Sequence, residues 1–267
     1  MSAEERTSRR PLVPAQRRRL IADRIRKAGS VTVATLEAEF GVSPMTARRD
    51  LQILEREGRA RRTHGGAVAP TLARDEDAFQ SRLAEAAEAK QRLGERAAEL
   101  IGPGETVFVD CSTTAYHAIR SLMESGREAT ILTPSVAVMD LIARSDAPRL
   151  ELLGLAGSLR RLTRSFVGPQ TVRAIQDHFA DKLLLSVKGL APGNVLTDAN
   201  PLEAEVKRTM ISRARESILL IDETKLDNPG LAAIAPLTDV EMVLVRGGSR
   251  DQLRALAESG VPIEELA

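Results

Sequence analysis

Hydroxyl-bearing side chains stand directly after two of the apolar runs in this sequence. Asp110-Cys-Ser-Thr-Thr114 follows one run, and Thr133-Pro-Ser135 follows the next. Hydroxyls and backbone N–H groups at a helix N-terminus bind anions, phosphate above all. The pattern therefore indicates an anion site. Ordinary N-capping of a helix by Ser112 or Thr113 explains the same residues about as well.

Charged residues follow two later apolar runs. Asp198, Glu203 and Lys207 come after one of them, and Asp222-Glu-Thr-Lys225 comes after the other. Glu203 and Lys207 lie four residues apart, so a simple ion pair on a helix surface is an alternative. Ligands of open parallel sheets bind beyond the carboxyl ends of the strands. The shared position of these groups at such ends favours one common site.

Alternating strand and helix patterns must position these groups. Six apolar, β-rich runs cover residues 106–110, 130–133, 150–155, 182–187, 217–222 and 240–246. Helical patterns separate them at residues 114–124, 136–144, 169–178, 201–214 and 250–258. Continuously apolar strands alternating with helices indicate a parallel sheet covered on both faces. We therefore expect an α/β domain with a mostly parallel sheet over residues 90–267.

A second group of residues is suited to contacting DNA. Ser43-Pro44 is typical of a helix start, and Ala47, Leu51 and Leu54 recur on one face of the helix expected over residues 44–57. Its opposite face carries two adjacent arginines, Arg48 and Arg49. Arginine side chains near a helix start reach guanine edges or phosphates in a major groove. Alternatively, they merely solvate a surface helix.

The neighbouring segments predict a small winged helix-turn-helix domain over residues 14–69. Helices are expected at residues 14–28 and 34–40, and a hairpin turning at Gly65-Gly66 is expected at residues 59–68. A short helix, a glycine turn and a capped helix are typical of a helix-turn-helix. His64 stands at the hairpin tip, where local packing is the simpler interpretation. The residues expected at the DNA are Ser43, Met45, Thr46, Arg48, Arg49, Gln52, Arg59, Arg61, Arg62 and His64.

The distribution of charge supports a division into two parts. Residues 1–70 carry 15 Lys and Arg against 8 Asp and Glu, whereas the other 197 residues carry 23 against 29. A basic module on an acidic body is typical of a nucleic-acid reader joined to another domain, although a solvated basic tail is an alternative. We expect a disordered tail over residues 1–13 and a linker over residues 70–89.

Composition excludes several other classes of protein. With no Trp, one Tyr and five Phe, an aromatic platform for single-stranded nucleic acid is not expected. One cysteine, Cys111, and three scattered histidines provide neither a disulfide framework nor a metal site, and no cofactor is expected. The sequence lacks a run of 18 apolar residues and an N-terminal apolar signal segment. We expect a soluble, cytoplasmic protein with no membrane partner.

The N-terminal motifs resemble those of the DeoR family of bacterial transcriptional regulators. The resemblance covers residues 16–68 and rests on Gly41-Val-Ser43, Thr46-Ala-Arg-Arg-Asp-Leu51, Leu54-Glu55, Gly58 and Arg62-Thr-His-Gly-Gly-Ala67. Two departures affect helix packing and leave the exposed arginines intact. Ala47 stands where the family has a larger aliphatic residue, and Thr35-Leu-Glu37 stands where a Glu-Leu-Ala pattern is usual.

Residues 79–246 resemble the C-terminal effector domain of the same family, whose fold is related to ribose-5-phosphate isomerase. The matching positions are Lys90, Gly102-Pro-Gly-Glu105, Asp110, Ser112-Thr-Thr114, Thr133-Pro-Ser135, Gly168, Glu203-Ala-Glu-Val-Lys-Arg208, Asp222 and Lys225. The resemblance implies that the effector is a phosphorylated sugar. Its phosphate end would contact Asp110, Ser112, Thr113 and Thr114, with Thr133, Ser135, Lys207, Asp222 and Lys225 as weaker candidates. The family's usual Asp-Ser-Gly-Thr-Thr is Asp-Cys-Ser-Thr-Thr here, which leaves open a different effector or lost sensing.

Two functions follow from these patterns. The first is a repressor of a carbohydrate catabolic operon that binds duplex operator DNA as a dimer or tetramer and is released by a phosphorylated sugar. Repression, rather than activation, is implied by the family resemblance alone. The alternative is a sugar-phosphate isomerase-like enzyme with Asp110, Glu203, Lys207 and Asp222 as acid–base groups. An isomerase has no need for the basic N-terminal module, so we expect a regulator and not an enzyme.

Overall fold

The chain divides into two compact units, Met1–Asp77 and Ala78–Ala267. The computed structural model describes residues 13–28, 30–57, 59–63, 65–68, 79–146 and 148–267. The expected N-terminal tail therefore lies almost entirely outside the described residues, as do His64 and most of the first half of the expected linker. Each unit has its own core.

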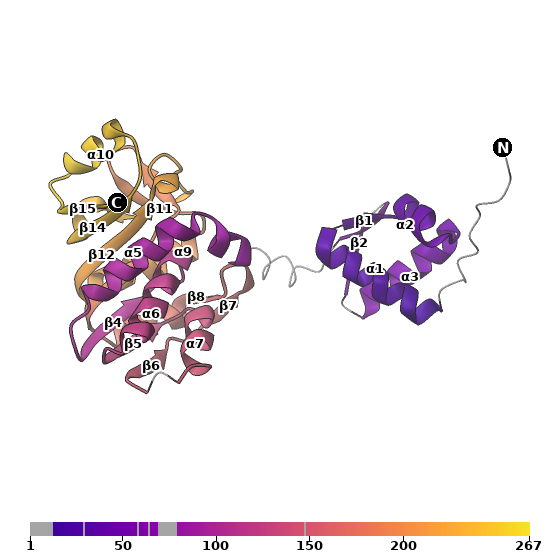
Figure 1. Ribbon diagram of the computed structural model, residues 1–267, viewed down its shortest axis with the longest axis horizontal. Coiled ribbons are helices and arrows are strands. Elements are labelled where there is room, and N and C mark those ends of the chain that lie inside the picture. Colours follow the sequence, from indigo (N-terminus) through magenta and orange to yellow (C-terminus); the bar gives the residue numbers. More distant parts are fainter. Residues whose placement is uncertain (1–12, 29, 58, 64, 69–78, 147) are drawn as a thin grey trace. The chain divides into compact units, whose positions relative to one another are not determined.

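The first unit contains three helices and a small antiparallel sheet among its described residues. The elements are α1 (Pro14–Ala28), β1 (Ser30–Thr32), α2 (Val33–Phe40), α3 (Pro44–Arg56), β2 (Arg61–Thr63) and β3 (Gly66–Val68) (Figure 1). The strand order is β1-β3-β2. Thr32 caps α2, Gly41 ends it with φ of 61°, and Ser43 caps α3. The positive φ at this turn favours glycine.

The core of the first unit forms where the three helices meet. Ile21 and Ile25 of α1, Leu36 of α2, and Leu51 and Leu54 of α3 are buried together. Leu51 and Leu54, together with Ala47, follow the spacing of a single helix face, as the sequence predicts. The opposite face of α3 is therefore free to contact another molecule.

The second unit is built on a seven-stranded, entirely parallel sheet with the strand order β15-β14-β12-β9-β4-β5-β6 (Figure 1). Its strands are β4 (Glu105–Val109), β5 (Ala129–Thr133), β6 (Leu150–Gly154), β9 (Ala180–Leu185), β12 (Ala214–Asp222), β14 (Met242–Arg246) and β15 (Ile263–Leu266). Its helices are α5 (Ala87–Glu99), α6 (Thr113–Ser125), α7 (Val136–Ala143), α8 (Pro169–Gln176), α9 (Pro201–Arg213) and α10 (Arg250–Ala257). The expected α/β class and parallel sheet are confirmed.

Helices cover both faces of this sheet because successive strand residues point to opposite sides. In β9, Leu184 packs in the cluster formed with α5, α6 and α7, whereas Leu183 and Leu185 pack in the cluster formed with α8, α9 and α10. All three leucines are fully buried. This two-sided burial explains the unbroken apolar runs of the sequence. α5 and α6 pack side by side (Figure 1).

Several short elements are additional to those predicted. β10 (Gly189–Ala191), β11 (Val195–Asp198) and β13 (Ala232–Pro236) form a second, antiparallel sheet, and β7 (Ser158–Arg160) pairs with β8 (Ser165–Val167). The 3-10 turns η1 (Arg161–Thr163) and η2 (Glu223–Lys225) and the edge strand β15 were also not expected. Residues 79–84 are helical and belong to the second unit, although they fall in the expected linker. No helix among the described residues is long and apolar enough to span a membrane.

Candidate functional site

The exposed face of α3 carries the residues expected at the DNA. Met45 is 71% exposed, and Arg48, Arg49 and Gln52 are exposed beside it. Ser43 and Thr46 lie at the start of the same helix, where the Ser43 hydroxyl accepts a hydrogen bond from the Thr46 amide at 3.2 Å. A large exposed methionine beside two arginines matches the mixture of apolar and base-edge contacts in a major groove.

The hairpin after α3 places further basic residues next to this helix. Arg61 lies in β2, and Arg62 is exposed beside it. The backbone N–H of Arg62 donates to Glu55 Oε1 on α3 at 2.9 Å, which ties the hairpin to the helix. Arg59 is exposed and forms only a loose ion pair with Glu57 at 3.5 Å. The hydrogen bond from Arg62 to Glu55 therefore joins the segment that carries Arg59, Arg61 and Arg62 to the helix that carries Arg48 and Arg49.

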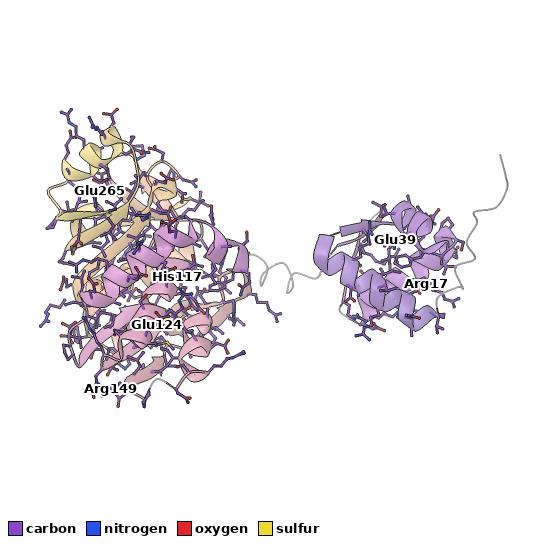
Figure 2. The ribbon with its side chains drawn as sticks, in the orientation of Figure 1. Arg17, Glu39, His117, Glu124, Arg149 and Glu265 are labelled. Carbon is purple, nitrogen blue, oxygen red and sulfur yellow. The ribbon has the colours of Figure 1, made fainter. Side chains whose placement is uncertain are left out.

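A buried ion pair fixes α3 against α1. Arg17 Nε donates to Asp50 Oδ2 at 2.6 Å, and Arg18 lies 3.5 Å from the other carboxylate oxygen of Asp50. The Asp50 side chain is only 4% exposed (Arg17 is labelled in Figure 2). Asp50 therefore holds the helix that carries Arg48 and Arg49, whereas the sequence pattern did not identify the role of Asp50 or Arg17.

The second unit contains a polar cavity of about 480 Å³ beyond the carboxyl ends of its strands. Its wall includes segments that follow β4, β9, β11 and β12. The lining residues are Ser81, Arg82, Glu85, Lys90, Cys111, Ser112, Thr113, Thr114, Arg160, Leu162, Thr163, Ser186, Val187, Lys188, Asp198, Ala199, Glu203, Lys207, Lys225 and Asn228. Six of these side chains are Lys or Arg, and three are Asp or Glu.

The N-terminus of α6 forms one side of this cavity. Ser112 caps the helix by accepting from the Ala115 amide at 3.1 Å, and the amides of Thr113 and Thr114 lie in the first helical turn, where no acceptor exists within the helix. Asp110 lies behind this turn and accepts from the amide of Ser112 at 2.9 Å and from its hydroxyl at 2.5 Å. Asp110 thus orients the turn rather than lining the cavity.

Lys207 is a buried cation held between two carboxylates. Its Nζ atom lies 2.8 Å from Asp198 Oδ2 and 3.4 Å from Asp110 Oδ2, and it donates to the carbonyl oxygen of Ser186 at 2.7 Å. Burial alone lowers the pKa of Lys207, but the two carboxylates outweigh it and raise this pKa above its ordinary value. Burial raises the pKa of Asp110 despite the charge of Lys207. The predicted alternative of a surface pair between Glu203 and Lys207 is wrong, because both side chains are buried.

Other cations surround the cavity from different elements. Lys90 of α5 donates to the carbonyl oxygens of Glu85, at 2.6 Å, and Arg82. Burial and the nearby charge of Lys225 lower the pKa of Lys90. Burial also lowers the pKa of Arg82, whose guanidinium donates to the Leu162 carbonyl at 2.8 Å. Lys225 is half-buried after β12, so positive charge approaches from three segments.

Glu203 of α9 introduces a carboxylate into the same wall. Its Oε1 atom accepts hydrogen bonds from Thr163 Oγ1 at 2.5 Å and Ser165 Oγ at 2.8 Å, and lies 3.6 Å from the guanidinium of Arg160. Burial, followed by the charges of Glu203 and Asp110, raises the pKa of Cys111 well above its usual range. The Cys111 thiol is therefore held protonated and unreactive.

Four of the residues expected at the effector do not line the cavity, namely Asp110, described above, and Thr133, Ser135 and Asp222. Thr133 bonds the Val109 carbonyl at 2.7 Å, joining β5 to β4, and Ser135 caps α7 by accepting from the Val138 amide at 3.3 Å. Asp222 caps η2 by accepting from the Thr224 amide at 2.9 Å. Hydroxyls and carboxylates at strand ends are used here to start the next turn or helix.

The structure brings Ser112, Thr113, Thr114, Lys207 and Lys225 together, as the sequence-based hypothesis requires. It adds residues that the hypothesis missed, chiefly Arg82, Lys90, Arg160, Lys188, Asp198 and Glu203. Asp198, Lys90 and Glu203 stood among the noted motifs, but nothing in the sequence indicated that Arg82 and Arg160 reach the same cavity. Arg82 lies in the short helical segment 79–84 and Arg160 ends β7, and both elements are too short to carry a strong pattern.

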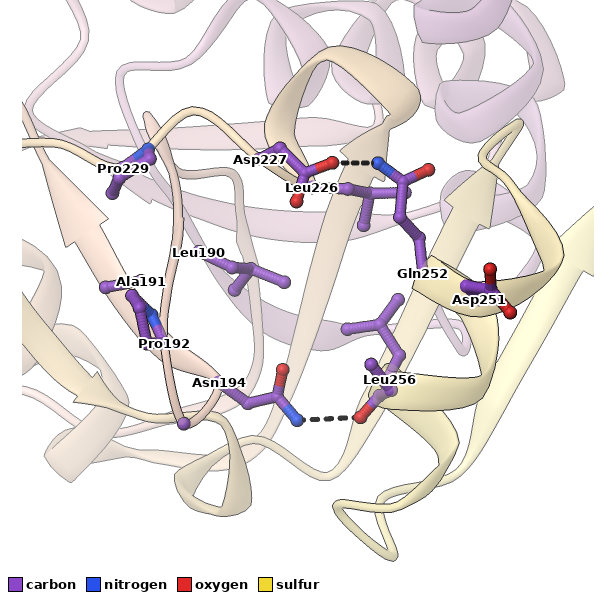
Figure 3. Close-up of a pocket in the computed structure, with 12 residues that line it drawn as sticks. Leu190, Ala191, Pro192, Asn194, Leu226, Asp227, Pro229, Asp251, Gln252 and Leu256 are labelled. Carbon is purple, nitrogen blue, oxygen red and sulfur yellow. Dashed lines mark hydrogen bonds between the residues drawn. The ribbon is translucent and has the colours of Figure 1, made fainter.

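A second cavity of about 540 Å³ lies elsewhere in this unit, between the β10–β11 turn and α10 (Figure 3). Leu190, Leu226 and Leu256 form apolar parts of its wall, and Asp227 and Asp251 lie at its edge. None of its described lining residues is Lys or Arg. Two carboxylates without a cation disfavour an anion, so this second cavity is not suited to phosphate. No group of described His, Cys, Asp or Glu residues is arranged to hold a metal ion.

Comparison with known families matches both units. Residues 17–72 match the DeoR-like helix-turn-helix domain, and residues 85–246 match the DeoR C terminal sensor domain. A putative aga operon transcriptional repressor of Escherichia coli O157:H7 is 32% identical, covering 93% of each chain. The HTH-type transcriptional repressor GlcR of Bacillus subtilis is 31% identical, covering 86% of this chain and 88% of that one.

A more distant relative and a solved structure extend the comparison. The HTH-type transcriptional regulator GlpR of Haloferax volcanii is 28% identical over 94% of this chain and 98% of its own. A ribose 5-phosphate isomerase A structure from Methanocaldococcus jannaschii aligns with a TM-score of 0.38 and 15% identity, covering 52% of this chain and 53% of that one. The matched domains and full-length relatives are those of regulators rather than enzymes. The chain belongs to the DeoR family of helix-turn-helix transcriptional regulators.

Proposed function

We propose that this regulator represses a carbohydrate catabolic operon and is released from its operator by a phosphorylated sugar bound in the 480 Å³ cavity. One observation carries the proposal. The first turn of α6 and six basic side chains line a single cavity in the sensor domain of a DNA-binding family. The names of its relatives, which include repressors, support repression rather than activation.

The phosphate end of the effector belongs at the start of α6. The amides of Thr113 and Thr114 and the Thr114 hydroxyl offer donors to phosphate oxygens, and the helix dipole adds favourable potential there. The Thr113 hydroxyl joins these donors by giving up its long hydrogen bond of 3.4 Å to the Arg82 carbonyl. Arg82, Lys188 and Lys225 supply positive charge from the surrounding wall. Lys207 is already occupied by Asp198 and Asp110, so its role is to hold the wall in place.

DNA binding is assigned to residues 14–69 and effector sensing to residues 90–267 together with the wall formed by residues 79–89. Operator contacts are made by Ser43, Met45, Thr46, Arg48, Arg49, Gln52, Arg59, Arg61, Arg62 and His64. The protein acts in the cytoplasm as a dimer or tetramer, since a helix-turn-helix regulator reads two half-sites about one helical turn apart, or a multiple of it.

The segment after residue 78 is the route by which effector binding influences the first unit. Arg82 and Lys90 line the cavity, and Thr113 Oγ1 donates to the carbonyl of Arg82 at 3.4 Å. Phe79 is buried against Tyr116 of α6, with ring centroids 5.9 Å apart. A ligand at the start of α6 therefore contacts the segment around Arg82. This segment is where the chain, coming from the DNA-binding unit, enters the second unit.

A thermal-shift screen tests the effector. We expect phosphorylated pentoses and hexoses to raise the melting temperature, whereas the same sugars without phosphate do not, because only the native state binds the ligand. Lys225→Gln should reduce the shift, and the exposed Arg250→Gln on α10 should leave it unchanged. Equal shifts with and without the phosphate group would contradict the proposal.

A further inference from the structure

Glu203 is a buried carboxylate in the mainly basic wall of this cavity, and its two oxygens differ in their contacts. Its side chain is 6% exposed, and all of its contacts, with Thr163, Ser165 and Arg160, are made through Oε1. Among the described residues, no group donates a hydrogen bond to Oε2. Because Oε2 is not among the fully enclosed atoms and Glu203 lines the cavity, this oxygen faces the cavity.

A carboxylate oxygen that faces a cavity and has no donor from the protein takes its hydrogen bond from water or from a ligand. The free oxygens of a fully ionised phosphate monoester cannot donate this hydrogen bond, because they carry no proton and only accept hydrogen bonds. A sugar hydroxyl can, and a hydrogen bond to a charged acceptor contributes more than one between neutral groups. The cavity therefore offers a ligand two kinds of group. The start of α6 and the surrounding cations provide hydrogen-bond donors and positive charge, whereas Glu203 of α9 provides a carboxylate acceptor.

We propose that Glu203 determines the sugar specificity of the effector site by accepting a hydrogen bond from a hydroxyl of the sugar through Oε2. This inference rests on the proposed function. The acceptor is held in place, because Thr163 of η1 and Ser165 of β8 both donate to Oε1 of the same carboxylate. Glu203 and the first turn of α6 line the same cavity, so one ligand can contact this acceptor and the donors of α6 together. Phosphate and hydroxyl recognition are thus combined in one small cavity.

Glu203→Gln is the informative variant. The amide oxygen of glutamine can still accept from Thr163 and Ser165, whereas its NH₂ group replaces the acceptor that faces the cavity. Glu205→Gln is the matched control, because Glu205 is exposed on the same helix. Thermal melting of both variants without ligand checks that they are folded.

Titration calorimetry of the full chain with inorganic phosphate, glycerol 3-phosphate, ribose 5-phosphate, fructose 6-phosphate and glucose 6-phosphate tests the inference. In the wild-type protein, we expect at least one sugar phosphate to bind ten or more times as tightly as inorganic phosphate. In the Glu203→Gln variant, the ratio of the two affinities should be about tenfold lower. The variant should bind inorganic phosphate at least as tightly as the wild type, because a repelling charge is removed. A purely structural role of Glu203 would weaken both ligands together.

The outcomes separate the two proposals. An unchanged ratio in Glu203→Gln, or a wild-type protein that binds no sugar phosphate more tightly than inorganic phosphate, overturns the role of Glu203 and leaves the phosphate site intact. Failure of all five compounds to bind the wild-type protein overturns the proposed function, and the role of Glu203 falls with it. An effect of Glu205→Gln equal to that of Glu203→Gln also contradicts the inference.

Discussion

The ammonium nitrogen of Lys207 lies 2.8 Å from Oδ2 of Asp198, and both side chains are largely removed from solvent. This pair joins α9 to the end of β11 beside the cavity of about 480 Å³. Burial alone raises the pKa of Asp198, but the charge and hydrogen bond of Lys207 outweigh it, so that the net pKa lies below its ordinary value. The pair therefore stabilises the second unit at neutral pH, and this stabilisation is lost in acid.

Asp198→Asn should destabilise the second unit by about 3–5 kcal/mol near neutral pH, because it leaves the buried Lys207 with one carboxylate fewer. A depressed carboxyl pKa contributes stability above its unfolded value of about 4, and this stability is lost as the pH falls through the folded pKa. Urea unfolding at several pH values should show the two proteins converging below about pH 4. Glu124→Gln, which breaks an exposed pair with Arg120, is the control. A difference between Asp198→Asn and the wild type that is independent of pH would contradict this explanation.

Asp50→Asn should unfold the first unit, or destabilise it by about 3–5 kcal/mol, because Arg17 loses the charge that compensates its burial. Operator binding should be lost while sugar-phosphate binding persists, which gel shifts and calorimetry on one sample can check. Glu39→Gln removes an exposed pair with Arg24 and should change stability by less than about 1 kcal/mol. Normal operator affinity in Asp50→Asn would show that the ion pair does not position α3.

Arg48→Ala and Arg49→Ala should each weaken operator binding by about 1–3 kcal/mol if the side chain contacts a base. A base contact should reduce the preference for operator over unrelated DNA, whereas a phosphate contact should weaken both equally. Arg215→Ala removes an exposed arginine from the second unit and serves as the control. Unchanged affinity in both α3 variants, measured by gel shift, would exclude this face of α3 from the interface.

Operator affinity should fall steeply as salt concentration rises, because each neutralised phosphate releases counterions. The excess of basic residues among residues 1–70 is the source of this dependence. Arg59→Ala should reduce the slope of the logarithm of affinity against the logarithm of salt concentration by about one if Arg59 contacts a phosphate. A flat salt titration of the wild-type protein would contradict a basic DNA-binding module.

Thr113→Val should weaken sugar-phosphate binding by about 1.5–3 kcal/mol, because it removes a hydroxyl donor from the first turn of α6 without changing the size of the side chain. DNA binding without effector should remain normal. Thr209→Val on α9, where the hydroxyl bonds only the Glu205 carbonyl, is the matched control. A wild-type inducer response in Thr113→Val would remove this residue from the effector site.

The parallel sheet was predictable because its strands are buried on both faces and leave unbroken apolar runs, as in β9 and β12. The β10–β11–β13 sheet and the β7–β8 hairpin were not, since strands of three to five residues such as Gly189–Ala191 carry too little pattern. The expectation that polar groups after parallel strands lie close together agrees with the structure for Ser112, Thr113 and Lys207, which line one cavity.

The same expectation could not distinguish residues that line the cavity from residues that cap the next helix or turn. Ser135 and Asp222 also follow strands, yet they serve the start of α7 and of η2. Glu203 and Lys207 have the spacing of a surface pair, and only the fold shows that both are buried with different partners. Long-range contacts such as that of Arg82 with Leu162 have no signature in the local sequence.

The most direct test is the affinity of the protein for labelled operator DNA from upstream of its own gene, measured by fluorescence anisotropy with and without each sugar phosphate that binds. Coupling between the sites must be reciprocal, so the operator should weaken effector binding by the same factor as the effector weakens operator binding. We predict that a bound sugar phosphate lowers operator affinity at least fivefold and that the unphosphorylated sugar has no effect. Operator affinity that is unchanged while a sugar phosphate saturates the cavity would contradict the account.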